Sequence, residues 1–220
     1  MIEAYANGAA LADAAARAVS MRLVEALRTH GRAGLVATGG RSPGAIYDRL
    51  SASAALDWTR VIVTLSDERC VAADDPASNA RLVRERLLKG VAAKAHLLPL
   101  WPEPEAAALA SLLPFDAVML GMGEDGHVAS LIPGDPGLEA ALSTSDLTRA
   151  VPAGLGKPPL ARVTLTLGAL LNARAIFLLI AGEAKREVIG RALAGEDLPV
   201  GRLISQSRAP IRIFWTPDGG

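Results

Sequence analysis

Short apolar runs recur along the chain and alternate with stretches of helical periodicity. Runs of this length, bounded by Gly, Pro or Asp, are typical of buried strands, and their alternation with helices indicates crossover units and a parallel sheet. The runs occupy residues 35–37, 61–65, 96–100, 117–120, 163–167, 176–181 and 211–215. We therefore expect an α/β fold: a doubly wound, largely parallel sheet with helices on both faces, in a three-layer α/β/α, Rossmann-like arrangement.

A chain of 220 residues suits one large domain as well as two small ones, and we take a single domain, residues 1–220, as the hypothesis. Helical periodicity marks residues 42–50, 78–88, 104–113 and 183–194. Ser42 and Ser78 stand where N-caps are expected, and Pro43 occupies a first-turn position that tolerates proline.

Two further segments have distinctive composition. Residues 1–31 fit an amphipathic helix rather than a signal peptide, because charged residues interrupt their apolar positions. Residues 146–159 contain two glycines and three prolines, which predicts a mobile surface segment without regular structure. An ordinary loop explains that segment as well as a cover over a site does.

The charges of the chain balance. Lys and Arg number 23, as do Asp and Glu, so no overall field draws the protein to nucleic acid or to an anionic membrane. The apolar runs are far shorter than the about 20 residues that span a bilayer. Cys70 is the only cysteine, which excludes an intrachain disulfide and fits a reducing cytoplasm. We expect a cytoplasmic protein with a small anionic ligand and neither a nucleic-acid nor a membrane partner.

The first segment with chemical character is TGGRSP, residues 38–43, which follows an apolar run and opens a helix. Gly39 and Gly40 allow a tight turn, and the free N–H groups at the start of a helix favour a phosphate. An ordinary glycine-rich turn is an equally good interpretation of this segment alone.

The second segment is SDER, residues 66–69, at the end of the run 61–65. Asp67 and Glu68 beside Arg69 could orient a substrate, and the guanidinium fork could bind an anion. A solvated surface triplet would have the same sequence.

The third segment, GMGEDGH at residues 121–127, follows the run 117–120 and is the most informative. It puts Asp125 and His127 two residues apart in a glycine-rich turn. An imidazole can take a proton from water near neutral pH while a carboxylate orients it, so the pair suits a general base, although a lone loop histidine is more often structural.

The same glycines formally satisfy the dinucleotide fingerprint G-x-G-x-x-G. That fingerprint requires a full helix after the glycines, whereas Pro133 and Gly134 cut the helix short here, so we reject a nicotinamide cofactor. His30, His96 and His127 are scattered and no cysteine pair is present, so we expect no metal site either.

The fourth segment runs from Arg162 through a strand at 176–181 to Lys185. It repeats the order of strand, glycine and helix start, and Lys185 in the first helical turn could reach an anion at the edge of the sheet. Taken alone, a surface lysine is the simpler interpretation.

Together these four segments resemble the 6-phosphogluconolactonase family, part of a wider group that includes glucosamine-6-phosphate deaminases. The resemblance covers nearly the whole chain and is carried by FDAVMLGMGEDGH with ASLIPG, by DER with Ser78-Asn79, and by RVTLTL with NAR and GEAK. It implies a hydrolase of the pentose phosphate pathway that needs neither metal nor cofactor and whose partner is a small phosphorylated sugar lactone. The sequence leaves open whether the protein is a monomer or a small homo-oligomer.

The resemblance also assigns roles. It makes His127 the general base and Asp125 its acidic partner, and it puts Asp67 in the pocket, bonded to sugar hydroxyls or to Arg69. The phosphate and substrate are expected to lie against Gly39, Gly40, Arg41, Ser42, Arg69, Arg162 and Lys185. Arg41-Ser42 departs from the Ser-Thr that the family usually has, so the side-chain contact at position 41 is in question.

Two rival functions remain. An amino-sugar phosphate deaminase or isomerase would share Asp67, Asp125 and His127, but that family usually has an aromatic residue where Arg69 stands. A non-catalytic sugar-phosphate sensor would normally carry an added DNA-binding domain, for which residues 1–31 leave no room.

Overall fold

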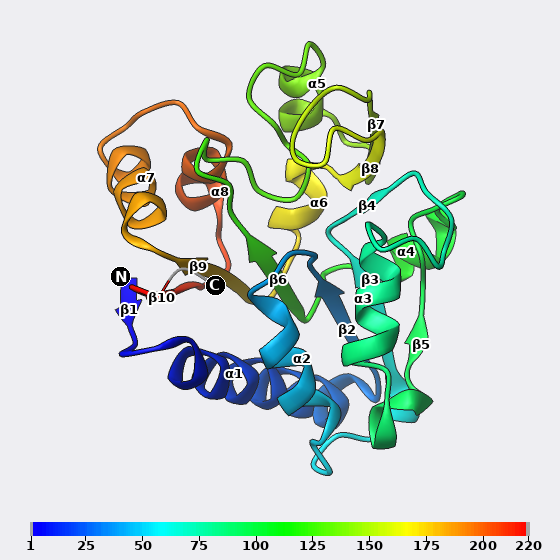
Figure 1. Ribbon diagram of the computed structural model, residues 1–220. Coiled ribbons are helices and arrows are strands. Elements are labelled where there is room, and N and C mark those ends of the chain that lie inside the picture. Colours follow the sequence, from blue (N-terminus) through cyan, green and yellow to red (C-terminus); the bar gives the residue numbers. More distant parts are fainter. Residues whose placement is uncertain (1, 219–220) are drawn as a thin grey trace.

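The computed structural model describes residues 2–218, whose central feature is a seven-stranded sheet (Figure 1). Met1, Gly219 and Gly220, which the predicted domain includes, lie outside the described residues. The strand order is β1-β10-β9-β6-β2-β3-β5, and every pair in this sheet is parallel. Its strands are β1 (Ile2–Ala4), β2 (Ala33–Ala37), β3 (Val61–Leu65), β5 (His96–Leu97), β6 (Ala117–Gly121), β9 (Ile176–Ala181) and β10 (Ile211–Thr216).

Helices cover both faces of this sheet, which confirms the predicted doubly wound α/β fold (Figure 1). The chain first builds outward from β2 to β3 and β5, then returns to β6 and builds the other way to β9 and β10. Right-handed crossovers therefore lie on opposite faces before and after this reversal. The helices are α1 (Gly8–His30), α2 (Pro43–Ser51) and α3 (Asn79–Arg86), followed by α4 (Ala106–Ser111), α5 (Leu138–Ser143), α6 (Leu167–Leu171), α7 (Glu183–Leu193) and α8 (Pro199–Gln206). Figure 1 shows α1 and α2 on one face and α7 and α8 on the other.

A second, antiparallel sheet corrects two expectations. It consists of β4 (Asp67–Arg69), β8 (Arg162–Leu165) and β7 (Thr148–Val151). The run 163–167, expected in the main sheet, instead contributes to β8, which pairs with β4 and β7 and ends at Leu165, and the Thr166 side chain caps α6. The segment 146–159 contains β7, because its prolines and glycines cluster after that strand rather than within it.

The helix ends also differ in part from expectation. The amphipathic helix begins at Gly8 rather than at the first residue, because Asn7 caps it with a bond of 2.9 Å to the Ala10 amide and β1 precedes it. Ser78 caps α3 as predicted, through a bond of 3.1 Å from the Arg81 amide. The cap expected of Ser42 is wrong, since that residue has helical backbone angles and its side chain makes no capping bond.

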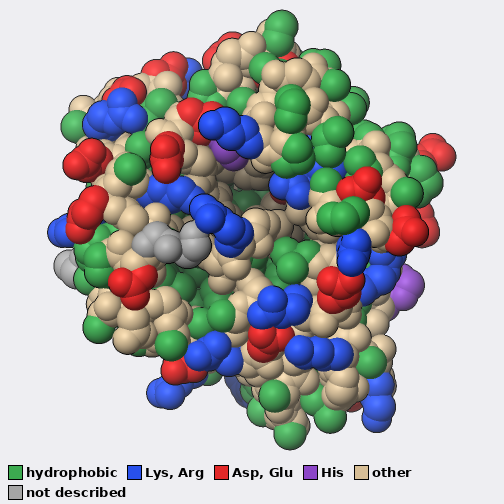
Figure 2. Space-filling model, in the orientation of Figure 1, with side chains coloured by type: hydrophobic (Ala, Val, Ile, Leu, Met, Phe, Trp, Pro, Cys, Tyr) green, Lys and Arg blue, Asp and Glu red, His purple; other side chains and the backbone are tan. Residues whose placement is uncertain are grey.

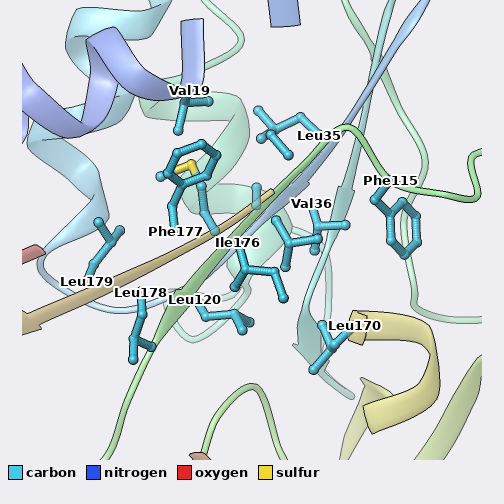
Figure 3. Packing of buried hydrophobic residues seen from close by; sticks show 14 of the residues in the cluster. Val19, Leu35, Val36, Phe115, Leu120, Leu170, Ile176, Phe177, Leu178 and Leu179 are labelled. Carbon is cyan, nitrogen blue, oxygen red and sulfur yellow. The ribbon is translucent and has the colours of Figure 1, made fainter. Parts of the chain in front are cut away.

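The hydrophobic core follows the central strands (Figure 3). All five residues of β2 are buried, as a strand covered on both faces requires. In Figure 3, Phe177 of β9 points toward Val19 of α1, whereas the next residue, Leu178, points to the opposite face. The alternation of side chains along one strand thus attaches helices to both faces of the sheet.

One buried carboxylate anchors β6 beside β2. Asp116 accepts a bond of 2.9 Å from the Gly34 amide, and its own amide donates to the Gly34 carbonyl at 3.1 Å. Arg174 lies 3.3 Å from the other carboxylate oxygen. These contacts hold the starts of β2 and β6 in register, so the opposite ends of the two strands are also held side by side.

Among residues 2–218, no helix combines the length and the apolar character needed to cross a membrane.

Candidate active site

The connections after β2 and β6 meet at the point where the strand order reverses. The two strands are neighbours, but one connection leads toward β3 and the other toward β9. Ligands in open α/β sheets bind in the crevice that such a reversal opens at the carboxyl ends of the strands. Figure 2 shows a hollow over the ends of β2 and β6, with basic side chains around it. A bond of 3.4 Å from the Gly121 amide to the Thr38 hydroxyl links the two strand ends.

The turn after β6 holds His127 against Asp125. Nδ1 of His127 lies 2.5 Å from Oδ1 of Asp125, and the same oxygen accepts the His127 amide at 3.2 Å. The hydrogen bond with His127 lowers the pKa of Asp125, so this carboxyl stays charged and favours a proton on Nδ1. The imidazole is 26% exposed, and Nε2, with its lone pair, is the nitrogen that remains for a ligand. The pair therefore has the geometry of an oriented general base.

Glycines permit this turn. The Gly126 backbone has φ of 80°, a left-handed conformation that glycine adopts without strain. At Gly123, a Cβ atom would lie only 2.3 Å from Nδ1 of His127 and 2.4 Å from Oδ1 of Asp125. The imidazole and the carboxylate thus pack directly on a backbone that has no side chain.

The turn after β2 combines two glycines with the start of a helix. Gly40 has φ of 102°, and a Cβ there would meet nothing within 4 Å, so this side of the turn is open. The first turn of α2 reads PGAI and brings no negative charge, and Ser42 does not cap it. The N-terminal amides of this nine-residue helix therefore suit an anion, with the Ser42 hydroxyl and the exposed Arg41 beside them.

Lys185 adds a cation from a third strand end. It lies in the first turn of α7, directly after β9 and Gly182. Burial lowers the pKa of Lys185, Glu124 raises it, and the charge of Arg41 lowers it further. Arg41 and Glu124 are thus close enough to Lys185 to influence its charge, although the three residues come from different segments of the chain.

The two carboxylates of the DER segment are used differently. Glu68 is 3% exposed and stabilises the start of α3. Its oxygens accept bonds of 2.7 to 3.0 Å from the Arg69, Asn79 and Ala80 amides and from the Ser78 hydroxyl. Asp67, also buried, accepts a bond of 2.6 Å from the Ser130 hydroxyl. Glu68 is therefore committed to the fold, whereas Asp67 belongs to a network at the edge of the hollow.

Arg162 lies deeper than its predicted role suggested. Its residue is 3% exposed, and its guanidinium donates at 2.8 Å to the Pro158 carbonyl and at 3.3 Å to the Ser130 hydroxyl. Nη1 of Arg162 lies 3.6 Å from Oδ2 of Asp67. Burial lowers the pKa of Arg162, opposed by the charge of Asp67. Arg162 thus contacts the hollow through Asp67 and Ser130 and also holds the loop before β8.

Arg69 is half-buried and donates at 2.6 Å to the Ala77 carbonyl, which fixes its side chain beside the network.

Ser130 belongs to the same network but was not identified as a site candidate from the sequence. Its hydroxyl joins Asp67 and Arg162, and its amide donates at 3.1 Å to the buried Thr164 hydroxyl. The motif ASLIPG contains Ser130 and was the available signal, but its burial and partners depend on strands far away in the sequence.

Within residues 2–218, no three His, Cys, Asp or Glu side chains gather where they could hold a metal ion.

Comparisons with known proteins identify the family of this chain. The profile of the family described as glucosamine-6-phosphate isomerases/6-phosphogluconolactonase matches residues 6–215. The chain belongs to this family. It is 41% identical to a 6-phosphogluconolactonase of Caulobacter vibrioides, with 97% of this chain and 96% of that protein aligned. A 6-phosphogluconolactonase structure from Shewanella baltica is 37% identical, with a TM-score of 0.89 over 98% of this chain and 97% of that one.

A glucosamine-6-phosphate deaminase is also similar in fold. A monomeric glucosamine-6-phosphate deaminase aligns over 97% of this chain and 96% of its own, with a TM-score of 0.75 but 20% identity. That likeness shows the shared fold alone. Within this family, identity is thus higher to the compared lactonases than to this deaminase.

We predict that Gly123→Ala breaks the contact between His127 and Asp125 while the protein stays folded. The added methyl would overlap the imidazole and the carboxylate, and the freed ring would shift toward the tautomer with its proton on Nε2. Nitrogen-15 NMR of the three histidines reports this shift directly. Gly190→Ala is the matched control, because a Cβ at that helical position meets nothing within 4 Å. An unchanged His127 spectrum in Gly123→Ala would contradict the packing described.

Proposed function

We propose that this protein is a 6-phosphogluconolactonase, which hydrolyses 6-phospho-D-glucono-1,5-lactone to 6-phospho-D-gluconate as a step of the oxidative pentose phosphate pathway. The observation that carries the proposal is the contact of 2.5 Å between His127 and Asp125, in a hollow that also contains an open anion-binding turn. The lactonase relatives support the choice of substrate.

In the proposed mechanism, Nε2 of His127 takes a proton from a water molecule whose oxygen attacks the lactone carbonyl at C1. The carbonyl electrons move to oxygen and return as the bond from C1 to the ring oxygen breaks, and the imidazolium gives its proton to that leaving oxygen. Asp125 keeps Nδ1 protonated and stabilises the transient imidazolium. General-base help of this kind is worth about 10²–10⁴-fold in rate.

In this mechanism the phosphate of the substrate is bound far from the reacting carbon. It would bind to the amides at Gly39, Gly40 and the start of α2 and to the Ser42 hydroxyl. The cations of Arg41 and Lys185 would also bind it. Energy from these contacts holds C1 beside the water that His127 activates, so binding far from the reacting atoms contributes to the rate.

Asp67 and Arg69 would face the sugar. Asp67 is held by Ser130 and Arg162, so its carboxylate cannot swing away, and it accepts hydrogen bonds from sugar hydroxyls. Arg69, fixed by the Ala77 carbonyl, brings a positive charge to the same side of the hollow. Arg162 would act through Asp67 because its own guanidinium is buried.

We further propose that the chain works in the cytoplasm as one domain, residues 1–220, without a cofactor, a metal, nucleic acid or a membrane as partner. The continuous core along the sheet and the balanced charge support a single unit that needs only its small substrate. A monomer or a small homo-oligomer would carry the same site, because the residues invoked come from one chain.

We predict that the wild-type protein accelerates opening of fresh 6-phosphoglucono-lactone and that His127→Ala loses about 10²–10⁴-fold of that acceleration. The assay couples the product to 6-phosphogluconate dehydrogenase, with spontaneous opening subtracted. His30→Ala is the control, since His30 is exposed at the end of α1. A folded wild type without activity would contradict the assignment, and ammonia release from glucosamine 6-phosphate would favour the deaminase.

Phosphate binding should weaken at alkaline pH through Lys185. Burial lowers the pKa of Lys185 from 10.5, so its ammonium is present below the lowered value and is lost as pH rises through it. We predict that the affinity for 6-phosphogluconate, measured by calorimetry from pH 7 upward, falls as the pH rises. The fall should begin at a lower pH than it would if Lys185 had the pKa of an ordinary lysine. In Lys185→Arg, whose guanidinium keeps its charge, the affinity should change little over this range. The same decline in both proteins would contradict a binding role for Lys185.

A further inference from the structure

Tyr47 forms two hydrogen bonds with the backbone of Thr38, the residue that follows β2. Its side chain is fully buried on α2, and its hydroxyl donates to the Thr38 carbonyl at 2.6 Å and accepts the Thr38 amide at 2.8 Å. We propose that Tyr47 is a positioning residue that sets the geometry of the turn 39–42 for phosphate. This inference rests on the proposed function of that turn.

The backbone of Thr38 needs a partner at this point. The last bond between the ends of β2 and β3 runs from the Ser66 amide to the Ala37 carbonyl, at 2.7 Å. Thr38 comes next and is only 4% exposed, so its amide and carbonyl have left the strand without reaching water. A phenol carries a donor and an acceptor on one atom, which lets Tyr47 satisfy both groups.

The same contact ties the two ends of the turn together. Tyr47 belongs to α2, whose N-terminal amides form one side of the proposed phosphate site, while Thr38 precedes Gly39 and Gly40 on the other side. Gly40 has a left-handed backbone, and a Cβ there would meet nothing within 4 Å, so no neighbour packs against that side of it. The hydroxyl of Tyr47 therefore fixes where the glycine amides lie relative to the helix start.

Asn79 supports the turn independently of Tyr47. A Cβ on Gly39 would lie 1.9 Å from Oδ1 of Asn79, so the Gly39 backbone packs against that amide. Nδ2 of Asn79 donates at 2.8 Å to the Asp67 carbonyl. Loss of the Tyr47 hydroxyl should therefore loosen the turn around Gly40 without releasing the whole loop.

The effect should be largest on phosphate binding and smallest on the chemistry at His127. Thr38 contacts the β6 end through a bond of 3.4 Å from the Gly121 amide to its hydroxyl, which is long and weak. A shift of the turn 39–42 is therefore transmitted poorly to the turn that holds His127. A merely structural role would instead lower activity equally for all substrates.

The test is Tyr47→Phe, which removes one oxygen and keeps the ring in the core. Its control is Tyr5→Phe, since Tyr5 is the only other tyrosine and its hydroxyl binds Glu3 beside the edge strand β1. Ile46→Val, at a fully buried neighbour on α2, controls for loss of packing.

The readout is kcat/KM for the phosphorylated lactone divided by that for unphosphorylated glucono-1,5-lactone. We expect Tyr47→Phe to lower this ratio by about 10-fold, mainly through KM, and both controls to leave it unchanged. Because both substrates meet the same folded molecules, a smaller folded fraction cancels from the ratio. An unchanged ratio in Tyr47→Phe would overturn the proposal.

Calorimetry with inorganic phosphate separates this inference from the proposed function. If the wild type binds phosphate without hydrolysing lactones, the lactonase proposal fails, and about 10-fold weaker phosphate binding by Tyr47→Phe still supports the role of Tyr47. Equal phosphate affinity in wild type and Tyr47→Phe, or a wild type that neither binds phosphate nor turns over the lactone, would overturn that role.

Discussion

Strands β2 and β6 lie side by side in parallel, yet the chain leaves their carboxyl ends in opposite directions. Asp116 bonds to both backbone groups of Gly34 through its side chain and amide and so holds the two strands together at their other ends. The turn 39–42 and the His127 turn therefore begin next to each other. The remaining parts of the site, Lys185 after β9 and Asp67 after β3, come from the next strands on either side.

Buried polar bonds, rather than exposed ion pairs, hold the site in shape. Asp67, Ser130 and Arg162 join the small sheet to the loop that follows His127, and Tyr47 performs a comparable task for Thr38. In each case a polar group that would be costly to bury alone is satisfied by a partner distant in sequence. The supports of Asp67 and Thr38 are therefore buried, whereas Asp125, which orients His127, is itself exposed.

The main sheet and the turns at its carboxyl edge could be predicted from the sequence, because apolar runs and glycine positions are local signals. The second sheet could not, since β8 has the apolar composition of a core strand and only its pairing with β4 and β7 distinguishes it. The DER segment marked Asp67 and Arg69 as candidates, but composition cannot separate a carboxylate that caps a helix, such as Glu68, from one that lies beside the hollow, such as Asp67. Ser130 and Tyr47 were missed because a serine in a loop and an aromatic residue in a helix acquire their roles only through tertiary contacts.

We propose that the ends of four strands, β2, β6, β9 and β3, form one site, with the phosphate at the turn 39–42 and the carbonyl carbon at His127. A crystal structure of the protein with 6-phosphogluconate tests this most directly. We expect the phosphate to accept hydrogen bonds from the Gly39 and Gly40 amides and from Lys185, while the C1 carboxylate lies beside Nε2 of His127. A phosphate bound away from this turn, or a C1 carboxylate out of reach of His127, would contradict it.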